Sequence, residues 1–376
     1  MALPKTIYDI GLHFGWRGTQ KGILLSVSSI GFIFAALIGG YLSELFGKKQ
    51  VMIFGLIFSI FGNITFGYFS GLNLPQTFYL LLFSNFFIGA AGGTLEGTTN
   101  ALVIHLHPDR GSLYLNLAHA FFAIGALGAP LIGGWLILLF NWQAVFYLNA
   151  AISTGIFGLI FFQSCPKFRM EEGIKLKIFA DLLKNKIFLL LNLCILFYVA
   201  AETGLVAWLA EYFRVNPNFK LSQFQSGMFL SYFWVTMLIG RFTYGWLVEK
   251  TSSSLALSLS SIGGMISIAL FLTTSNIIIA SLLIFTCGGF LSGMFATIFS
   301  LAGERFPHYL GVVSGSMTTS VGIGGIVSPN VIGRLSDIPG MGLSAGLATC
   351  IIYLLMVLLI VLLLSRSKEK TIFSVK

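Results

Sequence analysis

The chain alternates long apolar segments with short polar ones from end to end. A helix that crosses a membrane needs about 20 mostly apolar residues, and this length predicts eleven spanning helices. They lie at residues 22–45, 51–69, 78–104, 113–140, 144–163, 188–213, 223–248, 254–274, 277–303, 309–335 and 343–364. Strands of a membrane barrel are only about 10 residues long, and each segment in lipid must satisfy its own backbone hydrogen bonds. The pattern therefore predicts an all-α integral membrane protein.

Composition supports this class. Of 376 residues, 56% are hydrophobic and only 9% are charged, whereas about 25% of the residues in a soluble domain are charged. The four cysteines have no C-x-x-C spacing, so the sequence predicts neither a disulfide framework nor a metal site.

The net charge of +9 raises the question of a nucleic-acid partner, and the positions of the basic residues answer it. When the loops are assigned alternately to the two sides of the membrane, one side receives fifteen of the 22 lysines and arginines, and the other side receives six, Lys5 among them. Basic residues accumulate on the cytoplasmic side of membrane proteins. We therefore predict a multi-pass protein of the cell (inner) membrane with a cytoplasmic C-terminus and without a nucleic-acid partner.

Two internal matches indicate that the chain consists of two related halves. Residues 20–44 align with 225–249 at an offset of 205, and residues 125–134 align with 324–333 at an offset of 199. Parallel repeats of this kind are typical of transporters.

The repeat sets the expected organisation. We expect helical bundles at residues 1–163 and 188–376, joined by a cytoplasmic linker at 164–187. The helix at 188–213 has only the first eight residues as its counterpart in the first half, and no signal sequence is visible there. The chain is therefore expected to begin late in the first of twelve helices.

Three motifs resemble the major facilitator superfamily along the whole chain. GYLSELFGKK (40–49) resembles the loop between the second and third helices, with Glu44 in place of the usual aspartate. GWLVEK (245–250) resembles its shortened second copy, and GALGAPLIGG (125–134) resembles the Gly-Pro motif of helix five. The resemblance implies a fold of two pseudo-symmetric helical bundles, with 11 of an expected 12 transmembrane helices present.

The same resemblance implies structural roles for the motif residues. A cytoplasmic gate would use Gly40, Glu44, Gly47, Lys48, Lys49, Gly245 and Glu249. Pro130 and Pro329 would bend or tightly pack helices that move during alternating access. Arg241 lies within an apolar segment, and we interpret it as a gate residue that pairs with Glu249 or Glu44 rather than as a substrate contact.

Within the superfamily, TLEGTTN (94–100), LNLAHAFFAIGALGAP (115–130) and YVAAETGLVAWLAEYF (198–213) resemble the fucose:proton symporter family and related sugar permeases. This resemblance implies a monomeric secondary transporter without a cofactor, which takes up a sugar or similar hydroxylated small molecule. Either a proton or sodium would be the coupling ion. Glu96 occupies the place of the proton-coupling glutamate in the LE-x-x-x-N motif.

Glu96 is also the residue that the apolar pattern leaves unexplained. A charged carboxylate at mid-bilayer costs about 2.5–3.5 kcal/mol on insertion scales, so it tends to be neutral, paired, or exposed to a wet cavity. Asn100 lies one helical turn further on and shares its face. The alternative is a neutral glutamic acid that hydrogen-bonds to a neighbouring helix.

The other candidate substrate contacts are Asn116, His119, Glu202 and Trp208. Asn116 and His119 share a helical face and carry groups that can recognise hydroxyls, although an interhelical hydrogen bond would also explain them. Trp208 would stack on a sugar, or belong to the interfacial aromatic belt. Glu211, near the outer end of the same segment, is expected to be solvated.

Three other functions compete with sugar uptake. A membrane enzyme lacks support, because no H-E-x-x-H or G-x-S-x-G motif is present and the loops are short. Export of apolar compounds would suit the 37 phenylalanines, but the polar group around Glu96 favours a hydroxylated substrate. A degenerate, non-transporting membrane protein remains the third alternative, because of the expected missing helix.

Overall fold

The structure is a computed structural model that describes residues 2–106, 111–165, 181–306 and 309–366. The described residues form helices joined by short connections. The chain divides into two compact units, Met1–Glu172 and Gly173–Lys376, and each is described by itself.

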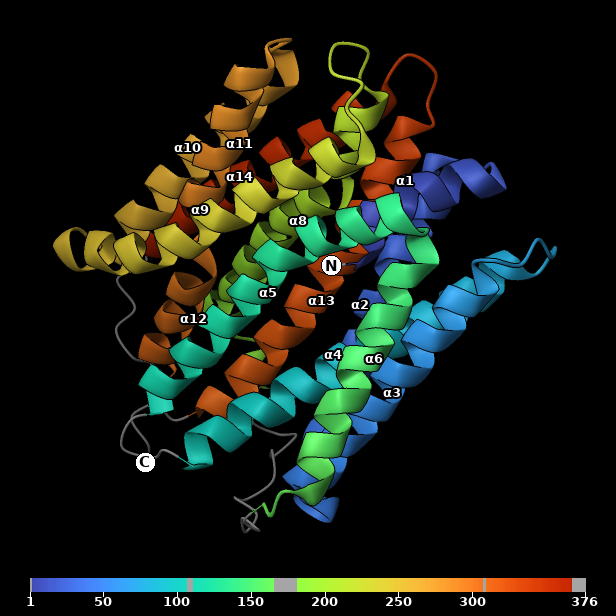
Figure 1. Ribbon diagram of the computed structural model, residues 1–376. Coiled ribbons are helices and arrows are strands. Elements are labelled where there is room, and N and C mark those ends of the chain that lie inside the picture. The colour runs from blue at the N-terminus through green and yellow to red at the C-terminus, as the bar shows by residue number, and fades with distance from the viewer. Residues whose placement is uncertain (1, 107–110, 166–180, 307–308, 367–376) are drawn as a thin grey trace, which may run out of the picture. The chain divides into compact units, whose positions relative to one another are not determined.

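The first unit contains six described helices (Figure 1), in the order α1 (Ala2–Phe14), α2 (Gly18–Phe46), α3 (Lys48–Phe69), α4 (Thr77–Leu106), α5 (Gly111–Leu139) and α6 (Trp142–Phe162). Helix α4 packs against α2 and α3, α6 packs against α3, and α1 contacts α5, α6 and α2. Lys5 lies in α1 and is 3% exposed, so its assignment to an outer loop was wrong. Residues 2–14 are helical and pack on α5.

Glycines bring α2 and α4 into close contact. A Cβ atom at Gly89 of α4 would overlap the backbone carbonyl of Ser28 on α2, and one at Gly93 would overlap the carbonyl of Phe32. Small residues at such positions let membrane helices approach to backbone contact. Asn85 adds a polar tie between the same helices, since its Nδ2 donates to the Leu24 carbonyl at 2.6 Å.

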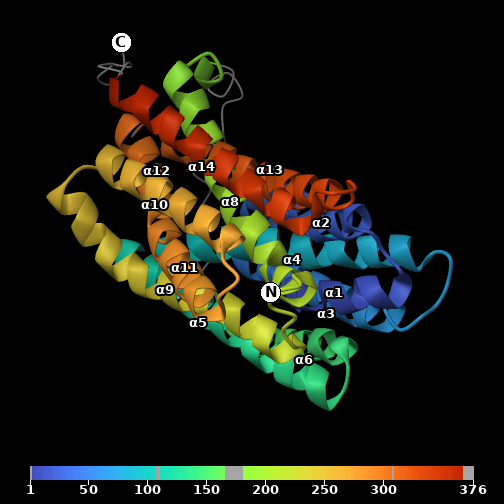
Figure 2. The ribbon, with the colours of Figure 1, turned by 90° about the horizontal axis from the view of Figure 1, so that it is seen from above.

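The second unit contains α8 (Lys186–Val215), α9 (Gln223–Lys250), α10 (Ser253–Thr273), α11 (Ile277–Leu291), α12 (Met294–Arg305), α13 (Leu310–Ser336) and α14 (Gly342–Arg366). Helix α8 is central to this unit, because α9, α12, α13 and α14 all pack against it. Figure 2 shows α13 and α14 alongside α8.

Polar residues at the starts of helices explain several boundaries. Side-chain oxygens accept hydrogen bonds from the free backbone N–H groups of the first turn, which is the usual role of Asn and Ser at an N-cap. The residues that do so are Asn141, Asn185, Ser222, Ser252 and Asn276. At Ser222 the pattern is a complete capping box with Gln225.

The predicted single helix at 277–303 was wrong in one respect, because it is interrupted between α11 and α12. The Ser292 hydroxyl donates back to the Gly289 carbonyl at 2.7 Å, and a Cβ atom at Gly293 would overlap the Tyr244 ring of α9. The Ser292 hydroxyl competes with backbone N–H groups for the Gly289 carbonyl, and Gly293 allows the Tyr244 ring to lie against the backbone. One helix therefore ends here and the next begins.

Eight segments among the described residues are long and apolar enough to cross a membrane. They are Gly18–Gly39, Lys48–Phe69, Thr77–Asn100, Trp142–Phe162, Lys186–Val215, Ser253–Thr273, Ile277–Arg305 and Gly342–Arg366. The other predicted spans fall in α5, α9 and α13, which are helical. Polar residues lower the hydropathy of α9, and glycine and serine lower that of α13, so these helices are not in that set. The structure thus supports an all-helical membrane protein without confirming eleven spans.

Candidate functional site

Glu96 lies on the face of α4 that packs against neither α2 nor α3. Gly93 contacts α2, and Leu95 lies against Gly55 of α3. Glu96 itself is exposed, and open space surrounds the position of a Cβ atom at Gly97. Asn100, one turn further on, is partly exposed. The first unit therefore has a polar strip with a carboxylate on an open face of a membrane-spanning helix.

Asn116 and His119 lie in α5, which contacts α4. Their side chains are outside the described residues. Their proposed participation with Glu96 and Asn100 therefore stays a prediction from the sequence.

Glu202 lies in the middle of α8, the central helix of the second unit. From residue 198 to residue 213, every residue is buried except Glu202 and Thr203, which are partly exposed. Glu202 and Thr203 are therefore the least enclosed residues in this stretch of α8.

The antiparallel packing of α8 and α9 brings Arg241 level with Glu202. The Phe213 and Phe229 rings fix the register, with centroids 4.0 Å apart. Eleven residues back along α8 and eleven forward along α9 is a rise of about 16 Å in both helices, which places Glu202 opposite Gly240.

Two tyrosines extend this polar group to the helix interruption. The Tyr198 hydroxyl donates to the Leu291 carbonyl at 3.1 Å, at the last residue of α11, and Tyr198 lies one helical turn from Glu202 in α8. Tyr244 accepts a hydrogen bond from the Ser260 hydroxyl of α10 at 3.1 Å. Interrupted helices with polar side chains at membrane depth are a recurrent feature of transporter binding sites.

Sequence reasoning named Glu202 and Arg241 separately and missed both tyrosines. The spacing of Tyr198 and Glu202, one helical turn apart, was the available signal. The pairing of Arg241 with Glu249 or Glu44 stays a prediction, because those two side chains lie outside the described part of the chain.

Two residues further along α8 are more enclosed than the sequence suggested. Trp208 is 0% exposed, so its ring has no free face here, and stacking on a sugar would require it to become uncovered. Glu211 is 4% exposed, so the expectation that it is solvated was wrong. Nearness to a helix end does not expose a residue when neighbouring helices extend past it.

The gate motif lies at the junction of α2 and α3. Gly47 joins the two helices with φ +94°, a conformation that favours glycine. Lys49 donates from Nζ to the carbonyls of Phe161 at 2.8 Å and Gln163 at 2.6 Å. Gly40 lies in α2 and Gly245 in α9, although their surroundings, like the Glu44 and Glu249 side chains, are outside the described residues.

Replacing Lys49 with glutamine is expected to destabilise the first unit by about 1 kcal/mol, because the last carbonyls of α6 lose a cationic donor. The measurement is the melting temperature of the purified protein in detergent. Lys184→Gln is the control, since its 3.5 Å ion pair with Asp181 is exposed and should contribute little. Equal melting temperatures for Lys49→Gln and the unmodified protein would contradict a capping role.

The two motif prolines are both buried inside continuous helices, Pro130 in α5 and Pro329 in α13. Lys48 begins α3. The roles of Pro130, Pro329 and Lys48 in alternating access remain predictions.

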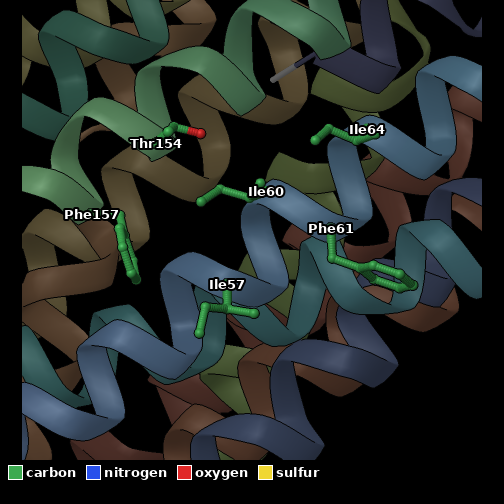
Figure 3. A pocket seen from close by; sticks show the side chains of 6 residues that line it. All are labelled: Ile57, Ile60, Phe61, Ile64, Thr154 and Phe157. Atoms are coloured by element: carbon green, nitrogen blue, oxygen red, sulfur yellow. The ribbon is translucent and has the colours of Figure 1, made fainter.

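An open groove of about 400 Å³ lies between α3 and α6. Figure 3 shows its lining: Ile57, Ile60, Phe61 and Ile64 come from α3, and Thr154 and Phe157 come from α6. The Thr154 hydroxyl donates to the Ala150 carbonyl within its own helix. The lining therefore suits lipid or another apolar molecule better than a hydroxylated one.

Residues 2–329 match the family model of the Major Facilitator Superfamily. The chain belongs to this superfamily, and it is accordingly a multi-pass membrane transporter in fold and family rather than a protein of an enzyme family.

Individual relatives are distant. NiaP of Bacillus subtilis (strain 168), named as a proposed niacin/nicotinamide transporter, is 27% identical over 346 residues, which cover 86% of this chain and 82% of that protein. The cis,cis-muconate transport protein of Acinetobacter baylyi is 23% identical over 363 residues, which cover 91% of this chain and 85% of the relative. The crystal structure of the E. coli fucose:proton symporter FucP has a TM-score of 0.66 at 22% identity, and it covers 97% of this chain and 96% of its own. At such identities, the structural likeness establishes the fold.

Proposed function

We propose that the protein is a proton-coupled importer of a sugar or similar hydroxylated small molecule, with Glu96 as the proton-carrying group. The observation that carries the proposal is the exposed Glu96 carboxyl on a membrane-spanning helix that packs its other faces against α2 and α3. A carboxylate facing lipid would be costly, so an open face with Glu96 and Asn100 is best explained as a wet, solute-accessible surface.

Alternating access explains why the carboxyl would need a proton. A transporter of this kind opens its site to one side of the membrane at a time, and moving an uncompensated charge through the closed state is unfavourable. A proton bound to Glu96 removes that charge. Each uptake cycle would then carry one proton from the outer side of the membrane to the inner side.

The remaining parts of the proposal concern topology and assembly. We propose eleven spans, a monomer, and an inner-membrane location with the C-terminus in the cytoplasm. Fifteen of the 22 basic residues fall on the side assigned to the cytoplasm, which supports this orientation.

The structural likeness to FucP supports a sugar as the substrate. The sequence relatives, however, are named for other solutes. Niacin or nicotinamide and cis,cis-muconate are named for the two sequence relatives above, while fucose is named for FucP. The substrate panel must therefore include more than sugars.

The experiment is uptake by the purified full chain in proteoliposomes with an inward pH gradient. Labelled hexoses and polyols are compared with nicotinate and cis,cis-muconate, and a sodium gradient replaces the pH gradient in a parallel arm. Gradient-dependent accumulation of a hydroxylated solute, abolished by a protonophore, is the expected result. Accumulation under sodium alone would reject proton coupling, and exclusive efflux of apolar compounds would reject the import function.

A further inference from the structure

The open groove between α3 and α6 lies outside the polar group proposed to carry transport. Both helices are long and apolar enough to cross a membrane, and they pack antiparallel. Printed in order along α3, the contacts that set their register are Lys49 with the Phe161 carbonyl, Ser59 with Ser153, and Ser70 with Trp142. The two walls of the groove are therefore held together above and below it.

The groove is apolar and accessible at membrane depth. Ile57, Phe61 and Ile64 of α3 are 42%, 41% and 46% exposed. On α6, a Cβ atom at Gly158, one turn after Thr154, would meet nothing within 4 Å. A gap in an apolar surface costs its lining the contacts of the missing neighbours, so this volume favours an apolar occupant.

Charge is present at one end of the groove only. Helices α3 and α6 are fully described, and their only charged residues are Lys48 and Lys49. The Lys49 ammonium donates to the Phe161 carbonyl, and the Phe161 ring stacks on Phe157, which lines the groove, with centroids 5.8 Å apart. Two of the three ammonium N–H groups bond to carbonyls of the last turn of α6 and the residue after it, which leaves a third donor. The surface is thus apolar along its length and cationic at one end.

The distance from this cation to the groove suits a phospholipid. Ile57 follows Lys49 by eight residues, a rise of about 12 Å, and the hydrocarbon of one leaflet is about 15 Å thick, half of the bilayer core. A headgroup at Lys49 therefore allows its acyl chain to reach the groove. A symmetric dimer through this face would instead place lysines of both chains at one level, with no acid from α3 or α6 to pair with them.

We propose that the groove holds an acyl chain of an anionic phospholipid, and that Lys49 binds the phosphate of its headgroup. In the proposed orientation this lipid belongs to the cytoplasmic leaflet, where anionic lipids attract basic residues. The chain packs against both walls, and the phosphate lies beside the ammonium group that already bonds to the end of α6. The site goes beyond the proposed function, because it depends on neither the transported solute nor proton coupling.

The test measures lipid binding to the purified, delipidated full chain by native mass spectrometry. Dioleoylphosphatidylglycerol is compared with dioleoylphosphatidylcholine, because the two have the same chains and differ in net headgroup charge. We expect the anionic lipid to bind about fivefold more tightly, which is the effect of one lysine near an anionic lipid. Inorganic phosphate should not displace it, since the acyl chain contributes most of the binding.

Two substitutions separate the acyl chain from the headgroup. Thr154→Phe should fill the groove and weaken binding of both lipids; Thr154 is exposed and bonds within its own helix, so this variant should fold. Thr273→Phe is the matched control, because Thr273 is also exposed and donates to the Ala269 carbonyl of its own helix. Lys49→Gln should lose the preference for the anionic lipid, and Lys49→Arg should keep it.

Four results would overturn the proposal. They are equal binding of the two lipids to the unmodified protein, unchanged lipid binding in Thr154→Phe, displacement of the anionic lipid by inorganic phosphate, and a dimer that Thr154→Phe dissociates. If Lys49→Gln does not fold, the comparison of Thr154→Phe with Thr273→Phe still decides whether the groove binds the chain. These assays need no solute and no gradient, so their failure leaves the proposed function standing, and a failure of uptake leaves the lipid site standing.

Discussion

Replacing Glu96 with glutamine is expected to abolish uphill accumulation of the substrate while leaving exchange of substrate across the membrane intact. Glutamine has nearly the same shape and keeps hydrogen-bonding capacity, but it carries no titratable proton. The variant therefore stays permanently in the equivalent of the protonated state. A pH difference of one unit supports about tenfold accumulation for one proton per solute, and this ratio should fall to about one.

The measurement pairs two assays on the same proteoliposomes. Accumulation under a pH gradient reports coupling, and counterflow of labelled against unlabelled substrate reports movement of the loaded carrier. Glu304→Gln is the matched control, since Glu304 is an exposed carboxylate that accepts a 3.3 Å hydrogen bond from Ser300 near the end of α12. It should leave both assays unchanged.

A different result would relocate the coupling site. If Glu96→Gln still accumulates substrate, the carboxyl group on α4 is structural and the proton is carried elsewhere, with Glu202 the next residue to test. If both accumulation and counterflow are lost although the protein folds, Glu96 contributes to substrate binding in addition to coupling.

The positions of the helices could be predicted because apolar length in a membrane protein is a direct physical requirement. Each predicted span falls in one described helix, except that 277–303 falls in two, α11 and α12. The interruption at Ser292 and Gly293 was missed because both residues are small and lie inside an uninterrupted apolar segment. At the interruption, the Ser292 hydroxyl bonds back to the Gly289 carbonyl and Gly293 lies against the Tyr244 ring of another helix, and hydropathy carries no information about such contacts.

In the candidate site too, the sequence predicted what depends on spacing within one helix and missed what depends on contacts between helices. Glu96 and Asn100 were assigned to one face from their spacing, and the packing of Gly93 and Leu95 explains why that face stays open. That Arg241 lies at the level of Glu202 depends on the register between α8 and α9. That register is set by rings such as Phe213 and Phe229, which in the sequence are two phenylalanines among 37.

Replacing Gly89 with alanine is expected to destabilise the first unit more than any single loss of a hydrogen bond discussed above. The added methyl group would overlap the Ser28 carbonyl, which is backbone and cannot rotate away. Relief requires α2 and α4 to separate, so the packing along Gly31, Gly89 and Gly93 would be lost together. Overpacking of this kind costs about 3 kcal/mol or more when the backbone has to move.

The same substitution eight residues further along the same helix provides the control. A Cβ atom at Gly97 meets nothing within 4 Å, and alanine is favoured over glycine inside a helix by about 1 kcal/mol. Gly97→Ala should therefore melt at or above the temperature of the unmodified protein in detergent, while Gly89→Ala melts well below it or is recovered mainly as aggregate in size-exclusion chromatography. Equal melting temperatures for the two variants would show that α2 and α4 do not make backbone contact at Gly89. In that case the close approach would no longer explain why α4 presents Glu96 on its remaining open face, and the case for a solute-accessible surface there would rest on Glu96 and Asn100 alone.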